Sequence, residues 1–441
     1  MTLQVAPSPS FADQFAAARR RLPGAGLPWM DSLREEAIAR FRQSGFPTPK
    51  LEAWKFTNLD RLARTGFETG GALSRPTLTR AALAPYRLTP ECHLLVLVDG
   101  RFRRELSEVD HLPGGTRIVE FAAASEDDLR ALATAPAVGA DARARSLSDL
   151  NTALMDSGAI VHLSRGAVLD PVQLLFVSTS RTTRPAFQIR NLIRADAGAS
   201  ATVLETYIGF GDATYWSNVV THVLVEPNAV LRHEKLQAES RDAFHIAATS
   251  VRVGRDAAYR AFTASLGAAL GRNEFDVNLA APGAEAQLTG VTLARGDQHL
   301  DTTLRLSHSQ PRGTSRQEFR SVVDDRAHTV FQGSIRVAPD AQKTDAQQLN
   351  QNLLLSASAA VDTKPELEIL ADDVKCSHGA AVGDLDKDAL FYLLARGVGE
   401  PDARALLINA FIGHLLDGLE GDASRTYFRR VVDHWLAEMR P

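Results

Sequence analysis

The chain has 441 residues, of which 44% are apolar and 23% are charged, and its net charge is −4. A chain of this length exceeds one ordinary core and predicts roughly three domains, or one elongated domain with attachments. No long block of lysines or arginines occurs, which argues against nucleic acid as a main partner.

The N-terminal residues and the cysteine count indicate a cytoplasmic protein with no membrane segment. Residues 1–10 contain neither the basic nor the apolar region of a secretory signal. No apolar run approaches the ~20 residues of a membrane span. Two cysteines in such a length exclude a disulfide framework and fit a reducing cytosol.

Residues 1–90 are predicted to form a helical domain. One helix is expected to begin near Ser10, with Phe11 and Phe15 on its apolar side. A second is expected from Asp31 to Gly45, where a glycine followed by a proline is a stop signal. Its apolar stripe consists of Leu33, Ala37, Ile38 and Phe41.

Residues 91–383 are predicted to form a β core. Short runs rich in valine, leucine, threonine and phenylalanine are separated by glycine, aspartate, asparagine and proline, without intervening helical stretches. Turn signals recur, often near thirty residues apart, although a sharp repeat is absent. They lie at 196–198, 226–229, 254–257, 282–284 and 339–341. This pattern favours a β-solenoid or a large sandwich.

The amide-rich stretch 347–352 has two interpretations. In a solenoid, stacked turns can align such side chains into amide ladders, which favours that fold. Alternatively, the amides simply cap turns. A solenoid has two open ends, and partners are expected to bind there.

Cys376 and His378 are the most informative residues of the chain. If the run from Pro365 to Gly379 is a strand, their spacing puts both side chains on one face. A thiol and an imidazole are good ligands for iron or zinc, but two ligands do not complete a tetrahedral site. The pair is therefore half of a shared site, or a buried cysteine and a hydrogen-bonded histidine without a metal.

Carboxylates surround this pair in the sequence. Glu366 and Glu368 alternate with apolar residues and share one face of the expected strand, and Asp372 and Asp373 follow. The commonest explanation for such carboxylates is a solvated strand face.

The C-terminal residues 384–441 are predicted to form a helical unit. Asp386 opens a helix that ends at Gly397, and Pro401 opens another. The last helix is marked by an apolar stripe of Tyr427, Phe428, Val431, Val432, Trp435 and Leu436.

Other candidate residues are predicted to be structural. Cys92 lies beside an apolar run and is expected in the core, and His222 and His233 are expected to be structural histidines. The chain contains no phosphate-binding Gly-x-x-x-x-Gly-Lys-[Ser/Thr] loop, so nucleotide binding by that device is not expected. A Gly-x-Ser-x-Gly nucleophile motif is also absent.

Several of these segments together resemble a known family. The chain is similar to the SufB/SufD family of the SUF iron-sulfur cluster assembly system, and its low cysteine count resembles the SufD branch. The matching segments are 47–57, 98–100, 341–345, 352–356, 363–369, 371–379, 389–393 and 396–397.

The resemblance implies a right-handed parallel β-helix between N-terminal and C-terminal helical domains. It implies a non-catalytic scaffold that pairs with a SufB-like chain through the β-helix end and docks a SufC-type ABC ATPase on its C-terminal helices. His378 would then be a ligand of transient iron or of a nascent cluster, working with a cysteine of the partner, and Cys376 is a candidate ligand beside it.

Two alternative functions remain open from the sequence. One is a β-helix enzyme that cleaves polysaccharides as a lyase or hydrolase, although such enzymes are mostly exported. The other is a purely structural partner in which His378 is a packed residue. The sequence also leaves open whether the chain forms a homodimer.

Overall fold

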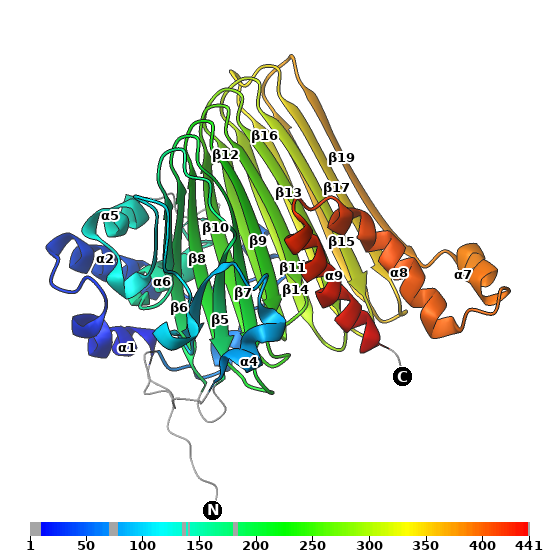
Figure 1. The fold of residues 1–441 in the computed structure, drawn as a ribbon, viewed down its shortest axis with the longest axis horizontal. Helices are drawn as coiled ribbons and strands as arrows, with labels where there is room; N and C mark the ends of the chain where they lie inside the picture. Colours follow the sequence, from blue (N-terminus) through cyan, green and yellow to red (C-terminus); the bar gives the residue numbers. More distant parts are fainter. Residues whose placement is uncertain (1–9, 70–77, 135–137, 140–141, 180–183, 440–441) are drawn as a thin grey trace, which may run out of the picture.

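The chain winds into a parallel β-solenoid with helices at both ends, in a computed structural model that describes residues 10–69, 78–134, 138–139, 142–179 and 184–439 (Figure 1). Residues 1–9, to which the expectation of no secretory signal applies, lie outside this range. The predicted fold class is confirmed, and the sandwich alternative is wrong because successive strands alternate between two parallel sheets.

Each full turn of the solenoid contributes one strand to each sheet. The ten-stranded sheet contains β1 (His93–Val98), β2 (Arg101–Phe102), β5 (Val172–Ser178), β7 (Ser200–Gly209), β9 (Val230–Ala238), β11 (Ala258–Ser265), β13 (Glu285–Ala294), β15 (Thr314–Val323), β17 (Asp345–Leu354) and β19 (Lys375–Asp384). The nine-stranded sheet contains β3 (Arg117–Glu120), β4 (Ala159–Leu163), β6 (Ala186–Ala195), β8 (Trp216–Val225), β10 (Phe244–Val253), β12 (Leu270–Leu279), β14 (His299–His308), β16 (His328–Val337) and β18 (Ala360–Ile369).

The tight turns between the sheets stack into a column and explain the recurring turn signals. Gly198, Asn228, Asp256 and Gly283 occupy the same turn position with positive φ of 73°, 60°, 50° and 73°. Each N–H donates to a carbonyl of the next turn, as from Gly198 to Pro227. Glycine, asparagine and aspartate tolerate this left-handed conformation best and occupy these four turns, whereas Arg312 and Lys343 adopt it in the next two turns, with φ of 60° and 62°.

The lumen between the sheets is rich in amides near the C-terminal end. The Gln348 side-chain amide donates to the Gln317 amide oxygen of the preceding turn at 2.6 Å, and Asn352 donates to Asn350 at 2.6 Å. Gln317 and Gln348 lie side by side on the stacked strands β15 and β17, which agrees with the amide-ladder interpretation for this pair, whereas Asn350 and Asn352 both lie on β17. The alternative, that the amides cap turns, is wrong.

Helices near the N-terminus cover the outer face of the nine-stranded sheet (Figure 1). These helices are α1 (Phe11–Ala18), α2 (Pro28–Ser44), α3 (Asp60–Arg64), α5 (Glu126–Thr134) and α6 (Ser146–Leu154). The short helix α4 (Arg80–Leu83) packs instead on the ten-stranded sheet, against β1 and β5. Short 3₁₀ helices are η1 (Arg19–Arg21), η2 (Glu52–Trp54), η3 (Ala84–Tyr86), η4 (Arg104–Leu106) and η5 (Phe121–Ala123). The predicted helix at 31–45 begins earlier, at Pro28, because proline suits a first helical turn.

Two helices correct the expectation that the predicted β core, residues 91–383, lacks helical stretches. Helix α5 buries Leu129 and Leu132, and α6 buries Leu147 and Leu150, each along one side of the helix. The apolar side of α5 packs on the first strands of the solenoid, and α6 packs against α2.

The three C-terminal helices agree with the predicted helical unit. Helix α7 (Lys387–Leu394) is capped by the Asp386 carboxylate, which accepts the N–H groups of Asp388 and Ala389. Helices α8 (Glu400–Asp417) and α9 (Asp422–Ala437) pack on the outer face of the ten-stranded sheet, whereas α7 projects away from the solenoid as an arm (Figure 1).

The division into domains at 1–90, 91–383 and 384–441 remains a prediction. Strands run from His93 to Asp384, with α5 and α6 between them. Within the described residues, no helix combines the length and hydropathy that crossing a bilayer requires.

Candidate functional site

The run from Pro365 to Gly379 is two strands joined by a turn, which corrects the single strand assumed from the sequence. Glu366 and Glu368 lie on β18 in one sheet, whereas Cys376 and His378 lie on β19 in the other. The alternating pattern continues on both sides of 370–374, and that turn contains neither glycine nor proline to mark it.

Cys376 and His378 nevertheless share a face, as their spacing predicts, and that face is the lumen of the last turn. In the parallel register, Cys376 lies beside Ala346 and His378 lies beside Gln348. Gln348 points into the lumen, since a Cβ on Gly333 of the opposite sheet would lie 2.3 Å from its side-chain nitrogen. Aligned residues of parallel strands point to the same side, so His378 continues this inner row.

The two side chains differ in their surroundings. Cys376 is half-buried and packs against an apolar cluster that includes Val337, Ala341 and Ala371. Burial raises the pKa of its thiol, with Asp345 adding to this and a backbone hydrogen bond from Ala346 opposing it. His378 is exposed. The thiol is therefore predominantly protonated at neutral pH, and of the two side chains the imidazole is the more accessible to solvent.

The neighbouring carboxylates face away from this pair. Glu366 pairs with Lys364 at 3.0 Å, and Glu368 pairs with Arg336 at 3.1 Å, both on the outer face of β18 and β16. These contacts support the solvated-face explanation. Over the part of the chain that the structure describes, no group of three or more histidine, cysteine, aspartate or glutamate residues is placed to hold a metal ion.

The last turn leaves both sheets with an open edge. Among the residues that the structure describes, β19 pairs only with β17 and β18 pairs only with β16, so each ends its sheet. Side chains that an additional turn would bury are exposed there: Ile369 by 40%, Leu370 by 47% and Val382 by 47%. Long edge strands with apolar residues favour pairing with another chain.

The other residues considered from the sequence are structural. Cys92 is buried in an apolar cluster, as predicted. His222 is buried between Arg190 and Ser250, with contacts of 2.8 and 2.7 Å, and burial, together with Arg190, lowers its pKa well below the ordinary value. His233 contacts Glu205 at 3.0 Å inside the lumen.

A buried charged cluster in the lumen was not predicted. Glu205 pairs with His233, and Glu239 lies 2.8 Å from His245. The charges of Glu205 and Glu239 both act on Lys235, so the two pairs and Lys235 form one cluster. Burial acts to raise the pKa of Glu205, but the hydrogen bond and charge of His233 and the charge of Lys235 lower it to about 2. Burial lowers the pKa of Lys235 to about 8, against the attraction of Glu205 and Glu239. Because these charges neutralise one another, we assign the cluster a structural role.

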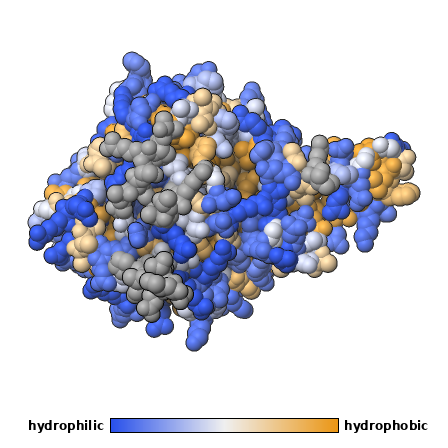
Figure 2. All heavy atoms as spheres, turned by 90° about the horizontal axis from the view of Figure 1, so that it is seen from below, coloured by the Kyte–Doolittle hydropathy of each residue, from blue (hydrophilic) through white to orange (hydrophobic). Residues whose placement is uncertain are grey.

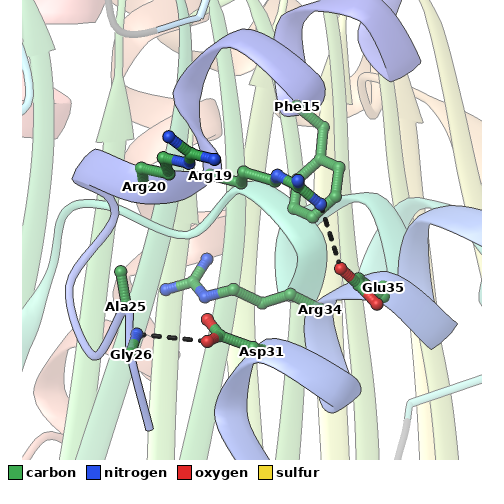
Figure 3. A pocket seen from close by; sticks show the side chains of 8 residues that line it. All are labelled: Phe15, Arg19, Arg20, Ala25, Gly26, Asp31, Arg34 and Glu35. Carbon is green, nitrogen blue, oxygen red and sulfur yellow. Dashed lines mark hydrogen bonds and ion pairs between the residues drawn. The ribbon is translucent and has the colours of Figure 1, made fainter. Parts of the chain in front are cut away.

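A cavity of about 490 Å³ lies among the N-terminal helices, and charged side chains that line it make structural contacts (Figure 3). The Arg34 guanidinium donates to the carbonyls of Ala153 and Met155 at 2.9 and 3.0 Å, which fastens α2 to the end of α6. Arg19 pairs with Glu35 at 3.1 Å across the cavity (Figure 3). Its charged side chains thus hold helices together.

Family models match both parts of this chain, the N-terminal region and the solenoid with its open last turn. Residues 176–411 match the model described as "SUF system FeS cluster assembly, SufBD core domain", and residues 6–174 match the "SufBD protein N-terminal region". The chain belongs to the SufBD family of iron-sulfur cluster assembly proteins.

Particular relatives are similar over most of their length. The iron-sulfur cluster assembly protein SufD of Escherichia coli is 32% identical over 88% of this chain and 89% of its own. The SufBD family protein slr0076 of Synechocystis is 35% identical over 84% of this chain and 83% of its own. Protein ABCI7, chloroplastic, of Arabidopsis thaliana is 30% identical over 93% of this chain and 86% of its own. These matches favour an assembly role over the polysaccharide-enzyme alternative.

Proposed function

We propose that the chain is a non-catalytic scaffold subunit that contributes half of a cluster-building site. The observation that carries this proposal is the lumen-facing pair of His378 and Cys376 on an open edge strand. The division at 1–90, 91–383 and 384–441 then separates a helical cover, a solenoid with the half-site at its end, and an ATPase-docking unit.

Pairing at the open end would complete the site. A SufB-like partner can add strands beside β18 and β19, because both present unpaired backbone groups along ten residues. The same contact would cover the exposed Ile369 and Val382. A heterodimer formed this way places the partner's side chains opposite the last lumen row, where a homodimer of this chain would repeat only the same two donors.

Iron, or a nascent iron-sulfur cluster, is the cargo that these donors suit. Imidazole and thiolate bind iron, and clusters are held by four such ligands, so the partner must supply the remaining thiolates. The Cys376 thiol must lose its proton before it can bind iron, and burial raises its pKa, whereas the exposed imidazole of His378 is accessible to iron. His378 is therefore the principal ligand in this proposal, and Cys376 is a helper.

The C-terminal arm is the proposed docking surface for a SufC-type ATPase. Hydrophobic side chains gather on the arm at the right of Figure 2, which carries α7. Phe391 is 71% exposed, and Tyr392, Leu394 and Leu406 are also exposed. An apolar patch of this kind marks an interaction site. Because α8 packs on β13 and β15, movement of the arm could reach the sheet that ends in β19.

The test is cluster formation in the purified complex of this chain with a SufB-like chain and a SufC-type ATPase. His378→Ala should abolish cluster formation and leave complex assembly intact, while Cys376→Ser should reduce the yield less. Ser377→Ala is the matched control, since Ser377 is exposed on the opposite face of the same strand. A normal cluster yield with His378→Ala would refute the ligand role and favour a purely structural partner.

A further inference from the structure

Segment 52–57 lies on the outer face of the nine-stranded sheet and contacts its last strands. The Ala53 carbonyl accepts from the Arg272 guanidinium on β12 at 2.7 Å, and Glu52 pairs with Lys364 on β18 at 2.5 Å. In the described part of the chain, β18 is the terminal strand of this sheet. The segment therefore links the interior of the sheet to its terminal strand.

A second link between the segment and β18 is a chain of four contacts that ends on two carboxylates, Asp301 and Asp362. The Thr57 hydroxyl donates to Asp301 on β14 and lies 2.9 Å from Nε2 of His299 on the same strand. Nδ1 of His299 lies 3.2 Å from Nδ1 of His328 on β16. Nε2 of His328 lies 2.8 Å from Asp362 on β18, which completes the chain.

The direction of the first two contacts follows from the charge of Asp301. This carboxylate is buried, pairs with Arg272 and accepts from the Thr303 hydroxyl at 3.0 Å, so it is ionised and can only accept. Thr57 has one hydroxyl proton, which it donates to Asp301. Nε2 of His299 must therefore carry a proton and donate it to the Thr57 oxygen.

The other two contacts need one proton more than two neutral imidazoles hold. The contact between the Nδ1 atoms needs a proton on one of the two rings, and the contact with Asp362 needs a proton on Nε2 of His328. With Nε2 of His299, these are three ring protons, whereas two neutral imidazoles hold two. Burial lowers the pKa of His299 to about 4, against the charge of Asp301, so His328 holds the additional proton at neutral pH.

Asp362 is the carboxylate that stabilises the positive charge of His328, from which it lies 2.8 Å away. The other charged groups near the histidine pair are Arg272 from β12, Asp301 from β14, Lys364 from β18 and Glu52 from segment 52–57. Arg272 pairs with Glu274 and Asp301. Lys364 pairs with Glu52 and Glu366. These groups balance one another, so the additional proton depends on Asp362.

We infer that His299 and His328 form a proton-dependent latch that holds the terminal strand β18 to segment 52–57. The latch is closed while His328 carries a proton on both ring nitrogens. When the pH rises and His328 loses one of them, one of the four contacts must break. The contact between His328 and Asp362 is the one that water replaces, because these side chains are 30% and 40% exposed.

Opening of the latch leaves β18 held to the segment by the ion pair of Lys364 and Glu52. Since β18 is an edge strand at the open end of the solenoid, the latch would make the order of that edge depend on pH. The inference uses neither residue of the lumen pair on β19, so it does not depend on the proposed cluster site.

The experiment is hydrogen–deuterium exchange of the full chain at about pH 6 and about pH 9, on either side of the range in which histidine changes charge. Peptides covering residues 360–369 report on β18, after correction for the intrinsic pH dependence of exchange. We expect exchange in β18 to be about threefold faster at the higher pH, because one hydrogen bond is lost.

Two substitutions of Asp362 separate the latch from other effects of pH. Asp362→Asn should keep exchange slow at both pH values, because the amide N–H can donate to Nε2 of a neutral His328 and so supplies the missing proton. Asp362→Leu can neither accept nor donate, so exchange should be fast at both pH values.

Lys364→Gln is the matched control, because it removes the other link between β18 and segment 52–57. It should speed exchange by the same factor at both pH values, since lysine and glutamate are charged at both. His434→Gln should behave as the natural chain does, because His434 is 77% exposed on α9.

Two results would overturn the inference: equal exchange of residues 360–369 at the two pH values in the natural chain, or a pH dependence in Asp362→Asn equal to that of the natural chain. Circular dichroism of each variant would confirm that the fold is retained. If the Asp362 variants unfold, His328→Gln gives the same test. Its amide can donate to Asp362 without titrating, so exchange should then be independent of pH, and a retained pH dependence would overturn the inference.

Discussion

We expect the attachment of α9 to the solenoid to depend on pH, because of the buried carboxyl group of Glu234. It lies on the outer face of β9 and is 3% exposed, and the Ser424 hydroxyl near the start of α9 donates to its Oε2 at 2.8 Å. Burial raises the pKa of Glu234 from 4.5 to about 7, against the Ser424 hydrogen bond and the charge of Arg232. The folded chain therefore binds this proton more tightly than the unfolded chain.

The sign of the effect follows from this difference. The favourable contribution of protonated Glu234 is fully present below pH 4.5 and is lost as the pH rises through about 7. Since one pKa unit corresponds to about 1.4 kcal/mol, ionised Glu234 lowers the free energy of unfolding by about 3 kcal/mol at pH 8. Glu234→Gln retains an acceptor for Ser424 and removes the charge.

Urea denaturation at several pH values measures this effect. At pH 8, Glu234→Gln should be more stable than the natural chain by up to about 3 kcal/mol, and the difference should fall below about 1 kcal/mol at pH 5. Glu91→Gln is the control, since Glu91 is exposed, and it should change stability little at either pH. A destabilising Glu234→Gln, or a difference in stability that does not vary with pH, would show that the buried charge of Glu234 does not destabilise the fold.

Two further predictions concern packing and buried charge. Phe428→Ala should lower the free energy of unfolding by about 3–5 kcal/mol, because Phe428 is fully buried on the side of α9 that packs on the ten-stranded sheet. Phe391→Ala should change it by less than about 0.5 kcal/mol because Phe391 is exposed, and equal losses in denaturation experiments would contradict this. Arg272→Met should cost about 3–5 kcal/mol, because it leaves the buried carboxylates of Asp301 and Glu274 without their cation, and a thermal midpoint unchanged from the natural chain would contradict that expectation.

Much of the fold could be predicted because it depends on local patterns. The apolar stripe of α9 gave its buried side, and the turn signals marked a real column of left-handed residues such as Asn228. Helix α6 was missed although Leu147, Leu150 and Leu154 carry a helical spacing, because the surrounding runs read as strands. Only the packing against α2 shows why that segment is helical.

The candidate site was predictable only in part. The spacing of Cys376 and His378 correctly placed them on one face, but the lumen position depends on alignment with β17, which no local pattern encodes. The turn at 370–374 puts them on a different strand from Glu366 and Glu368. This turn was not predicted, because the alternating pattern of the sequence gives no sign of a break there. The buried Glu205 cluster could not be found from the sequence, because its members come from different turns.

In the proposed function, the last turn supplies half of a site that a partner completes. An iron anomalous difference map of the cluster-loaded complex of this chain with a SufB-like chain tests this directly. We expect iron in bonding contact with His378, with its remaining ligands from the partner. Iron bound wholly by partner residues away from β19 would contradict it.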